Sequence, residues 1–92
     1  MRVLTSDDFN AFLSKNKKCL VMFGASWCGP CKVLKPKLQA LGKPNVAYMD
    51  VTSNPHAQEL QILAVPTLVA FLDGKPTIRE HNLTQNILTF LE

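Results

Sequence analysis

The sequence predicts an α/β protein with a mixed β-sheet covered by helices on both faces. Short continuous apolar runs recur along the chain and alternate with segments of helical periodicity. Early strands separated by helices need crossover connections and favour parallel pairing. The dipeptide Asp73-Gly74 lies between two extended segments and predicts an antiparallel hairpin near the end of the chain.

The first predicted elements are a very short strand at residues 3–4 and a helix that follows it. We expect Ser6 to cap this helix, and Asp7 and Asp8 suit the positive end of its dipole. The lysine cluster at residues 15–18 is expected to end it. Its apolar side chains recur on one face, at Phe9, Phe12 and Leu13.

A central strand and a second helix come next. Residues 19–23 form a continuous apolar run, which predicts a buried strand. The pattern is helical from Pro30 to about Leu41, with a kink expected at Pro36. Gly42 should end this helix. The residues predicted to be buried on it are Val33, Leu34, Leu38 and Leu41.

The second half of the chain continues the alternation. Residues 46–51 predict another central strand, and Asn54-Pro55 predicts the start of a helix that runs to about Leu63. Residues 67–72 predict a third buried strand. Residues 75–80 return as an edge strand, because Pro76 cannot donate to a sheet ladder. Thr84 is expected to cap a last helix, with Ile87, Leu88 and Leu91 on its apolar face.

Length and composition predict one small domain. The chain has 92 residues, which we expect to form a single domain over residues 1–92. The net charge is +3 without a long basic run, so nucleic-acid binding is not expected. No apolar segment approaches the ~20 residues of a membrane span, and residues 1–8 turn polar too soon for a secretory signal. We therefore expect a cytoplasmic monomer that does not bind a membrane.

Residues 27–32, with the sequence WCGPCK, predict a redox-active dithiol. Cys28 lies where a strand gives way to a helix, and the unpaired N–H groups there favour a thiolate. Lys32 and Lys35 add positive charge, which also lowers a thiol pKa. Cys31 lies on the same side of the first helical turn, at a separation that suits a disulfide. We expect Cys28 to attack a target disulfide and the more buried Cys31 to resolve the mixed disulfide.

Two other uses of the cysteine pair stay open at this point. The pair could form a static disulfide, although so short a loop restrains little of the unfolded chain. It could also supply half of a zinc site, for which Cys19, His56 and His81 are the further candidate ligands. Cys19 itself is expected to be a buried thiol that packs as a small apolar group.

The sequence resembles the thioredoxin family over nearly its whole length. The resemblance rests on residues 23–32 (FGASWCGPCK) and on motifs in the family's order, namely Asp50, Asn54-Pro55, Val65-Pro66-Thr67 and residues 71–74. It implies the thioredoxin fold and a protein-disulfide reductase with no cofactor or metal. The implied partners are disulfide-containing proteins and a thioredoxin reductase.

The resemblance also implies the residues that contact a target. Pro66 is expected to be a cis-proline facing the dithiol, and the backbone of Val65 is expected to pair with the target peptide. A flat apolar surface around Cys28 would be formed by Trp27, Gly29, Pro30, Val65 and Pro66. A role for His81 in target contact is a further possibility.

The sequence departs from the family pattern beneath this site. The family usually has a buried acid at the position of Met22 and often a lysine at that of Tyr48. An aromatic residue is often found where this chain has Gly24, and a glycine where it has Asn82. The missing acid leaves open how Cys31 loses its proton. Water and the departing Cys28 thiolate are the candidates.

Two alternative functions differ from a thioredoxin-type reductase. One is a glutathione-coupled reductant of glutaredoxin type, against which the dipeptide Gly29-Pro30 argues because that family typically has Pro-Tyr there. The other is a binding module or accessory subunit that uses the fold without its thiols.

Overall fold

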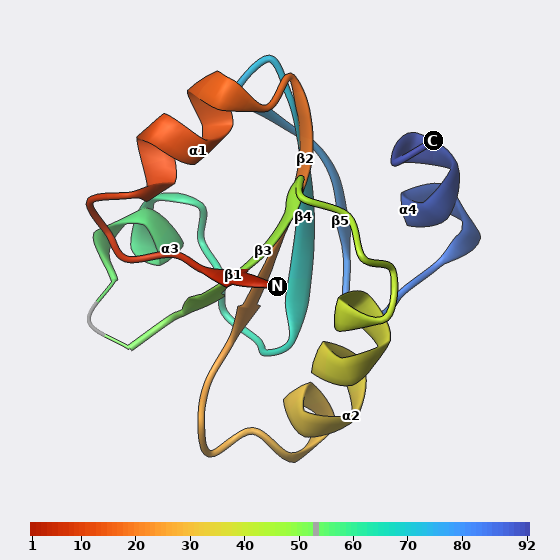
Figure 1. The fold of residues 1–92 in the computed structure, drawn as a ribbon. Coiled ribbons are helices and arrows are strands. Elements are labelled where there is room, and N and C mark those ends of the chain that lie inside the picture. The colour runs from red at the N-terminus through yellow and green to blue at the C-terminus, as the bar shows by residue number, and fades with distance from the viewer. Residues whose placement is uncertain (53) are drawn as a thin grey trace.

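The computed structural model describes residues 1–52 and 54–92, which form a five-stranded sheet with two helices against each face (Figure 1). The strand order is β1-β3-β2-β4-β5. Helices α1 and α3 lie on one side of the sheet, and α2 and α4 lie on the other (Figure 1). The elements are β1 (Arg2–Val3), α1 (Phe9–Lys15), β2 (Lys18–Gly24), α2 (Gly29–Gln39), β3 (Val46–Asp50), α3 (Pro55–Glu59), β4 (Thr67–Leu72), β5 (Lys75–Glu80) and α4 (Gln85–Phe90).

The pairing of the strands is mixed, as the sequence predicts. β1 and β2 both run parallel to β3, whereas β4 is antiparallel to β2 and to β5. The connection through α3 therefore enters β4 at the same edge of the sheet where β2 and β3 end. The register pairs Phe23 with Thr67, so Pro66 lies beside the end of β2.

Alternation along the strands divides the core into two layers. Leu20 and Met22 of β2 point towards α2 and α4, whereas Cys19, Val21 and Phe23 point towards α1 and α3. All five side chains have no exposed surface. Each face of the central strands is thus buried under helices, which explains why residues 19–23 are uniformly apolar.

The hairpin between β4 and β5 is confirmed, with the turn at Asp73 and Gly74. Both residues have positive φ, 51° and 78°, as the tightest two-residue hairpin turn requires. β5 lies at the edge of the sheet, which accommodates Pro76. A register irregularity interrupts the pairing at Ala70 and Phe71.

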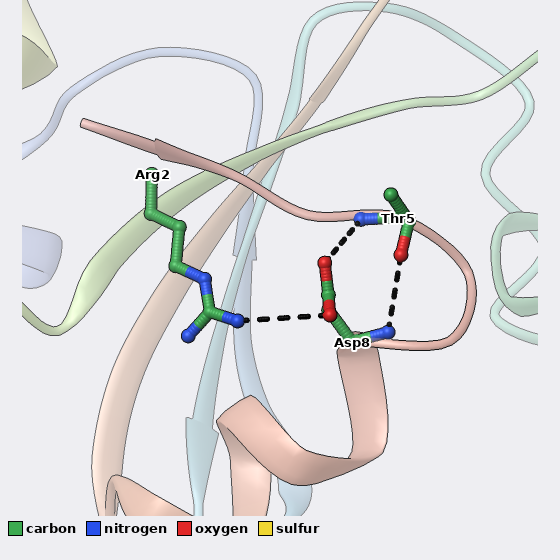
Figure 2. Close-up of polar contacts among 3 residues, drawn as sticks. All are labelled: Arg2, Thr5 and Asp8. Atoms are coloured by element: carbon green, nitrogen blue, oxygen red, sulfur yellow. Dashed lines mark hydrogen bonds and ion pairs between the residues drawn. The ribbon is translucent and has the colours of Figure 1, made fainter.

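The predicted start of α1 was wrong, because the helix begins at Phe9 after the N-cap residue Asp8, and not after Ser6. Thr5 and Asp8 exchange two hydrogen bonds in the turn that precedes the helix (Figure 2). The Thr5 N–H donates to the Asp8 carboxylate at 3.2 Å, and the Asp8 N–H donates to the Thr5 hydroxyl at 3.3 Å. Arg2 also reaches Asp8 in an ion pair of 3.7 Å. Hydrogen bonding of the carboxylate to Thr5, first of all to its backbone N–H, lowers the pKa of Asp8.

The two following helices end earlier than predicted. α2 ends at Gln39. α3 ends at Glu59, because Gln61 adopts a left-handed conformation with φ 55°. Leu63 lies beyond the helix and is 94% exposed. On α2, Leu34 and Leu38 are buried as predicted, Leu41 is partly buried, and the expectation that Val33 is buried was wrong, since it is 62% exposed.

None of the helices in the described part of the chain has the length and hydrophobicity of a membrane span.

Candidate redox site

The cysteine pair lies at the N-terminus of α2, just beyond the edge where β2 ends. Cys28 is the N-cap residue, with an extended backbone at φ −87° and ψ 112°. Its Sγ accepts a hydrogen bond from the backbone N–H of Cys31 at 3.2 Å. Pro30 lies in the first turn, where its missing N–H leaves no intrahelical bond unmade. The free N–H groups and the helix dipole therefore both favour negative charge on the Cys28 sulfur.

Cys28 and Cys31 are joined by a disulfide, with their Cα atoms 5.3 Å apart. The two side chains are equally buried, each 4% exposed, so the expectation that Cys31 is the more buried one was wrong. In this bonded state the exposed fraction does not distinguish the two residues. What does distinguish them is position, because Cys28 precedes the helix and Cys31 lies within its first turn.

The residues predicted to contact a target surround this pair with very different exposure. Trp27 is 73% exposed, and Gly29 and Pro30 are also exposed. Val65 is half-buried against the core cluster that contains both cysteines. Pro66 is buried and follows a cis peptide bond, which confirms the predicted isomer.

A groove beside the disulfide runs between α2 and the loop that follows β5. It has a volume of about 290 Å³ and brings Pro30 next to Pro66. Val33, Leu34 and Lys37 line it from α2, and His81 and Asn82 line it from the opposite side. The sequence reasoning missed Val33 and Lys37 here. The buried face of α2 is the one that carries Cys31, Leu34 and Leu38, and Val33 lies off this face.

His81 links this groove to the cis-proline loop. Its Nδ1 lies 3.1 Å from the carbonyl oxygen of Pro66 and 3.4 Å from the hydroxyl oxygen of Thr67. The Thr67 hydroxyl in turn donates to the carbonyl of Ala64. The ring thus braces the loop that faces the cysteine pair.

Comparison with known proteins identifies the family. A family model described as thioredoxin matches residues 1–91. The chain belongs to the thioredoxin family. A thioredoxin from Mycobacterium tuberculosis is 44% identical over 73 residues, which are 73% of this chain and 63% of the relative. The match thus spans less than two thirds of that relative's length.

Two further relatives extend the comparison. The structure of Fasciola hepatica thioredoxin superposes with a TM-score of 0.82 at 36% identity and covers 97% of this chain and 93% of its own. A protein of Mycobacterium leprae named bifunctional thioredoxin reductase/thioredoxin is 39% identical over 85 residues, which are 86% of this chain and 19% of that protein. The predicted thioredoxin fold is confirmed.

Beneath the disulfide, this chain has apolar and aromatic groups where the family pattern has charges. Met22 is completely buried and pairs in register with Tyr48 on β3 and with Leu68 on β4. Tyr48 is 8% exposed, and the Lys35 ammonium lies 4.1 Å from the centre of its ring. Burial raises the pKa of the Tyr48 hydroxyl, and the nearby Asp50 carboxylate raises it further.

A second, smaller pocket opens beside these groups. It has a volume of about 190 Å³ and is lined by Ala25, Ser26, Cys31, Lys32, Lys35 and Tyr48. Lys32 is exposed and lies on the wall of this pocket together with Cys31. The structure thus places the predicted thiolate-stabilising lysine beside the second cysteine of the pair.

The candidate zinc ligands do not come together with the cysteine pair. Cys19 lies in the core layer under α1 and α3, on the other face of the sheet. The ring of His56 stacks on Phe9 at 4.5 Å in that same layer. In the described part of the chain no three His, Cys, Asp or Glu residues form a metal-binding group.

Proposed function

We propose that this chain is a thiol–disulfide oxidoreductase that reduces protein disulfides through the Cys28–Cys31 pair. The observation that carries the proposal is the hydrogen bond from the Cys31 N–H to Cys28 Sγ at the N-terminus of α2. It gives Cys28 a donor that stabilises a thiolate. The second sulfur, at bonding distance from the first, then allows the pair to close.

The reaction would run in two exchange steps. The Cys28 thiolate attacks one sulfur of the target disulfide, so that a Cys28–target bond forms and the other target sulfur leaves as a thiolate. Cys31 then loses its proton and attacks Cys28 Sγ. The Cys28–Cys31 bond forms, the Cys28–target bond breaks, and the second target thiolate takes up a proton. Two electrons pass from the cysteine pair to the target.

The surface around Cys28 would hold the target peptide. The exposed ring of Trp27 and the small, exposed Gly29 and Pro30 form a protein surface that a chain can approach closely. The backbone of Val65 would pair with an extended peptide in the manner of an added strand. Pro66 would be the floor of this contact, and Lys32 would stabilise the thiolate electrostatically.

A reductase must return the pair to the dithiol, since each turnover leaves it oxidised. The Mycobacterium leprae relative is named as both thioredoxin reductase and thioredoxin, which supports a thioredoxin reductase as the partner. We propose that residues 1–92 act as one domain and as a monomer in electron transport to cytoplasmic disulfides. The reducing conditions of that compartment suit a pair that must be reopened.

Insulin reduction tests the proposal. The wild-type chain with dithiothreitol should accelerate insulin precipitation, and Cys28→Ser should lose this activity. Cys31→Ser should instead accumulate a mixed disulfide with the target, because Cys28 attacks but nothing resolves the product. Lys43→Gln, at an exposed residue, serves as a control for substitution as such and should keep full activity. Activity that survives in Cys28→Ser would refute the nucleophile, and an inactive wild-type chain would favour a binding module.

A further inference from the structure

Two departures from the family pattern, Gly24 and Tyr48, meet at one point beside Cys31. A Cβ atom built on Gly24 would lie 2.9 Å from Tyr48 Cε2, 3.0 Å from the Tyr48 hydroxyl oxygen and 3.2 Å from Cys31 Sγ. A side chain at position 24 would therefore collide with both neighbours. Because Gly24 has none, the phenol of Tyr48 and the sulfur of Cys31 approach each other from β3 and α2.

The ring of Tyr48 thus occupies the space that an aromatic side chain at position 24 would need. Its hydroxyl is carried to the pocket that Cys31 and Ser26 line. At about 190 Å³ that pocket has room for a water molecule, and its walls supply several polar partners. One water between the hydroxyl and the sulfur would connect them by hydrogen bonds.

We propose that Tyr48 is a positioning residue for Cys31: its hydroxyl donates a hydrogen bond, through one water, to the Cys31 sulfur as this sulfur becomes a thiolate. This rests on the proposed disulfide exchange and concerns its second step. The Cys31 proton leaves through the same water to solvent. Tyr48 itself keeps its proton and gives up none.

The lysines around the pocket favour the thiolate, and the carboxylate near it opposes it. From α2, the ammonium of Lys35 lies over the Tyr48 ring, and Lys32 lines the pocket. Burial and, from β3, the carboxylate of Asp50 disfavour ionisation of Tyr48, so that the phenol stays a donor. β2 contributes Met22 and Gly24 on this face, and α4 contributes Ile87 and Leu91, none of which titrates. Across the cysteine pair, His81 contacts the cis-proline loop.

Stopped-flow reaction of the reduced protein with 5,5′-dithiobis(2-nitrobenzoate) separates the two steps. Attack by Cys28 releases one thionitrobenzoate, and attack by Cys31 on the resulting mixed disulfide releases a second. The first phase reports on the proposed function and should disappear in Cys28→Ser. The second phase reports on Tyr48, so the failure of one proposal can be told from the failure of the other.

Tyr48→Phe removes the hydroxyl and keeps the ring beneath Lys35. We expect it to raise the Cys31 pKa by roughly half to one pH unit. A smaller fraction of Cys31 is then ionised at neutral pH, but the thiolate that remains is more nucleophilic. The second phase should therefore slow only roughly two- to threefold at neutral pH. Above the Cys31 pKa of both proteins the order should reverse, because both sulfurs are then fully ionised and the higher-pKa thiolate of Tyr48→Phe is the better nucleophile. The first phase should keep its rate.

The Cys31 pKa can be read directly from the ¹³Cβ shift of labelled cysteine in a Cys28→Ser background. Cys19 reports in the same spectrum and should not respond to Tyr48→Phe, since it lies in the other core layer. Lys35→Gln should move the Cys31 pKa in the same direction by less, and Lys43→Gln should not move it. An unchanged Cys31 pKa with a superimposable second-phase pH profile would overturn the proposal. So would an equal slowing of both phases, which would indicate a disturbed site.

Discussion

The two faces of the sheet carry cysteines of opposite chemical character, although the same central strands build both. Cys19 lies within β2 under α1 and α3, among the rings of Phe9, Phe12 and Phe71. Burial raises the pKa of its thiol to about 11. Cys28 lies on the other side, at a helix N-terminus, with a backbone N–H directed at its sulfur. Both residues are shielded from solvent, so burial alone does not decide whether a thiol is reactive.

The difference between the faces lies in which unpaired polar groups meet the sulfur. Within a strand the backbone N–H groups belong to the sheet ladder, and the Cys19 side chain packs in a cluster of buried apolar residues. At the start of α2 the N–H groups have no intrahelical acceptor. The face under α2 and α4 therefore combines a closed apolar core with one polar edge, where Cys31 and Tyr48 lie.

The largest expected effect comes from a carboxyl introduced into either layer at neighbouring positions. Met22→Asp and Val21→Asp each bury an acid at a side chain with no exposed surface. Each should cost about 3 kcal/mol or more of unfolding free energy at neutral pH. Because burial raises the pKa of such a carboxyl, the cost should grow as pH rises above the unfolded value of about 4. Thermal unfolding of the oxidised proteins measures it.

The pH dependence of insulin reduction in these two variants gives a second comparison of the two core layers. Met22 belongs to the layer that holds the cysteine pair, so Met22→Asp should also change the pH dependence of insulin reduction. Val21 points into the other layer, so Val21→Asp should lower stability without changing the shape of that profile. Met22→Leu keeps the volume and serves as the control. An unchanged midpoint and an unchanged pH profile in Met22→Asp would break the distinction between the layers.

An intermediate effect on the free energy of unfolding is expected from Cys19 at alkaline pH. Its folded pKa of about 11 exceeds the ordinary value of 9.0, so the unfolded chain loses this proton first. The stability that Cys19 contributes is thus complete below pH 9 and is lost as pH rises towards 11. The loss should be on the order of 2–3 kcal/mol. Cys19→Ala should show a flatter stability profile over this range in denaturant titrations, with full insulin reduction. Equal slopes for the two proteins would contradict it.

The sequence predicted the order of elements because each strand and helix carries its own local signal. The apolar run at residues 19–23, the Asn54-Pro55 cap and the Asp73-Gly74 turn each act within a few residues. The cysteine pair was likewise recognisable, since its motif is contiguous. What failed were inferences that depend on neighbours distant in sequence, such as the exposure of Val33.

Tyr48 shows why the rest of the site could not be predicted. The family resemblance marks Tyr48 as a departure beneath the site, but the residue pattern shows it only as part of a strand that alternates between two covered faces. Its position beside the pocket that Cys31 lines depends on the parallel register of β2 and β3 and on the absence of a side chain at Gly24. Neither pairing register nor that vacant volume can be read from residue types along one segment.

The smallest expected effect concerns the hydrogen bonds between Thr5 and Asp8 in the turn before α1, remote from the disulfide. Asp8 accepts a hydrogen bond from the Thr5 N–H, which lowers its pKa (Figure 2). The stabilising contribution of this carboxylate is present above its unfolded pKa and is lost as pH falls through the lowered folded value. Asp8→Asn should therefore lower the melting midpoint slightly at neutral pH and not at the acid end. Its rate of thionitrobenzoate release should equal that of the parent, since α1 covers the face that holds Cys19. A changed rate would show that the two layers are coupled through the sheet.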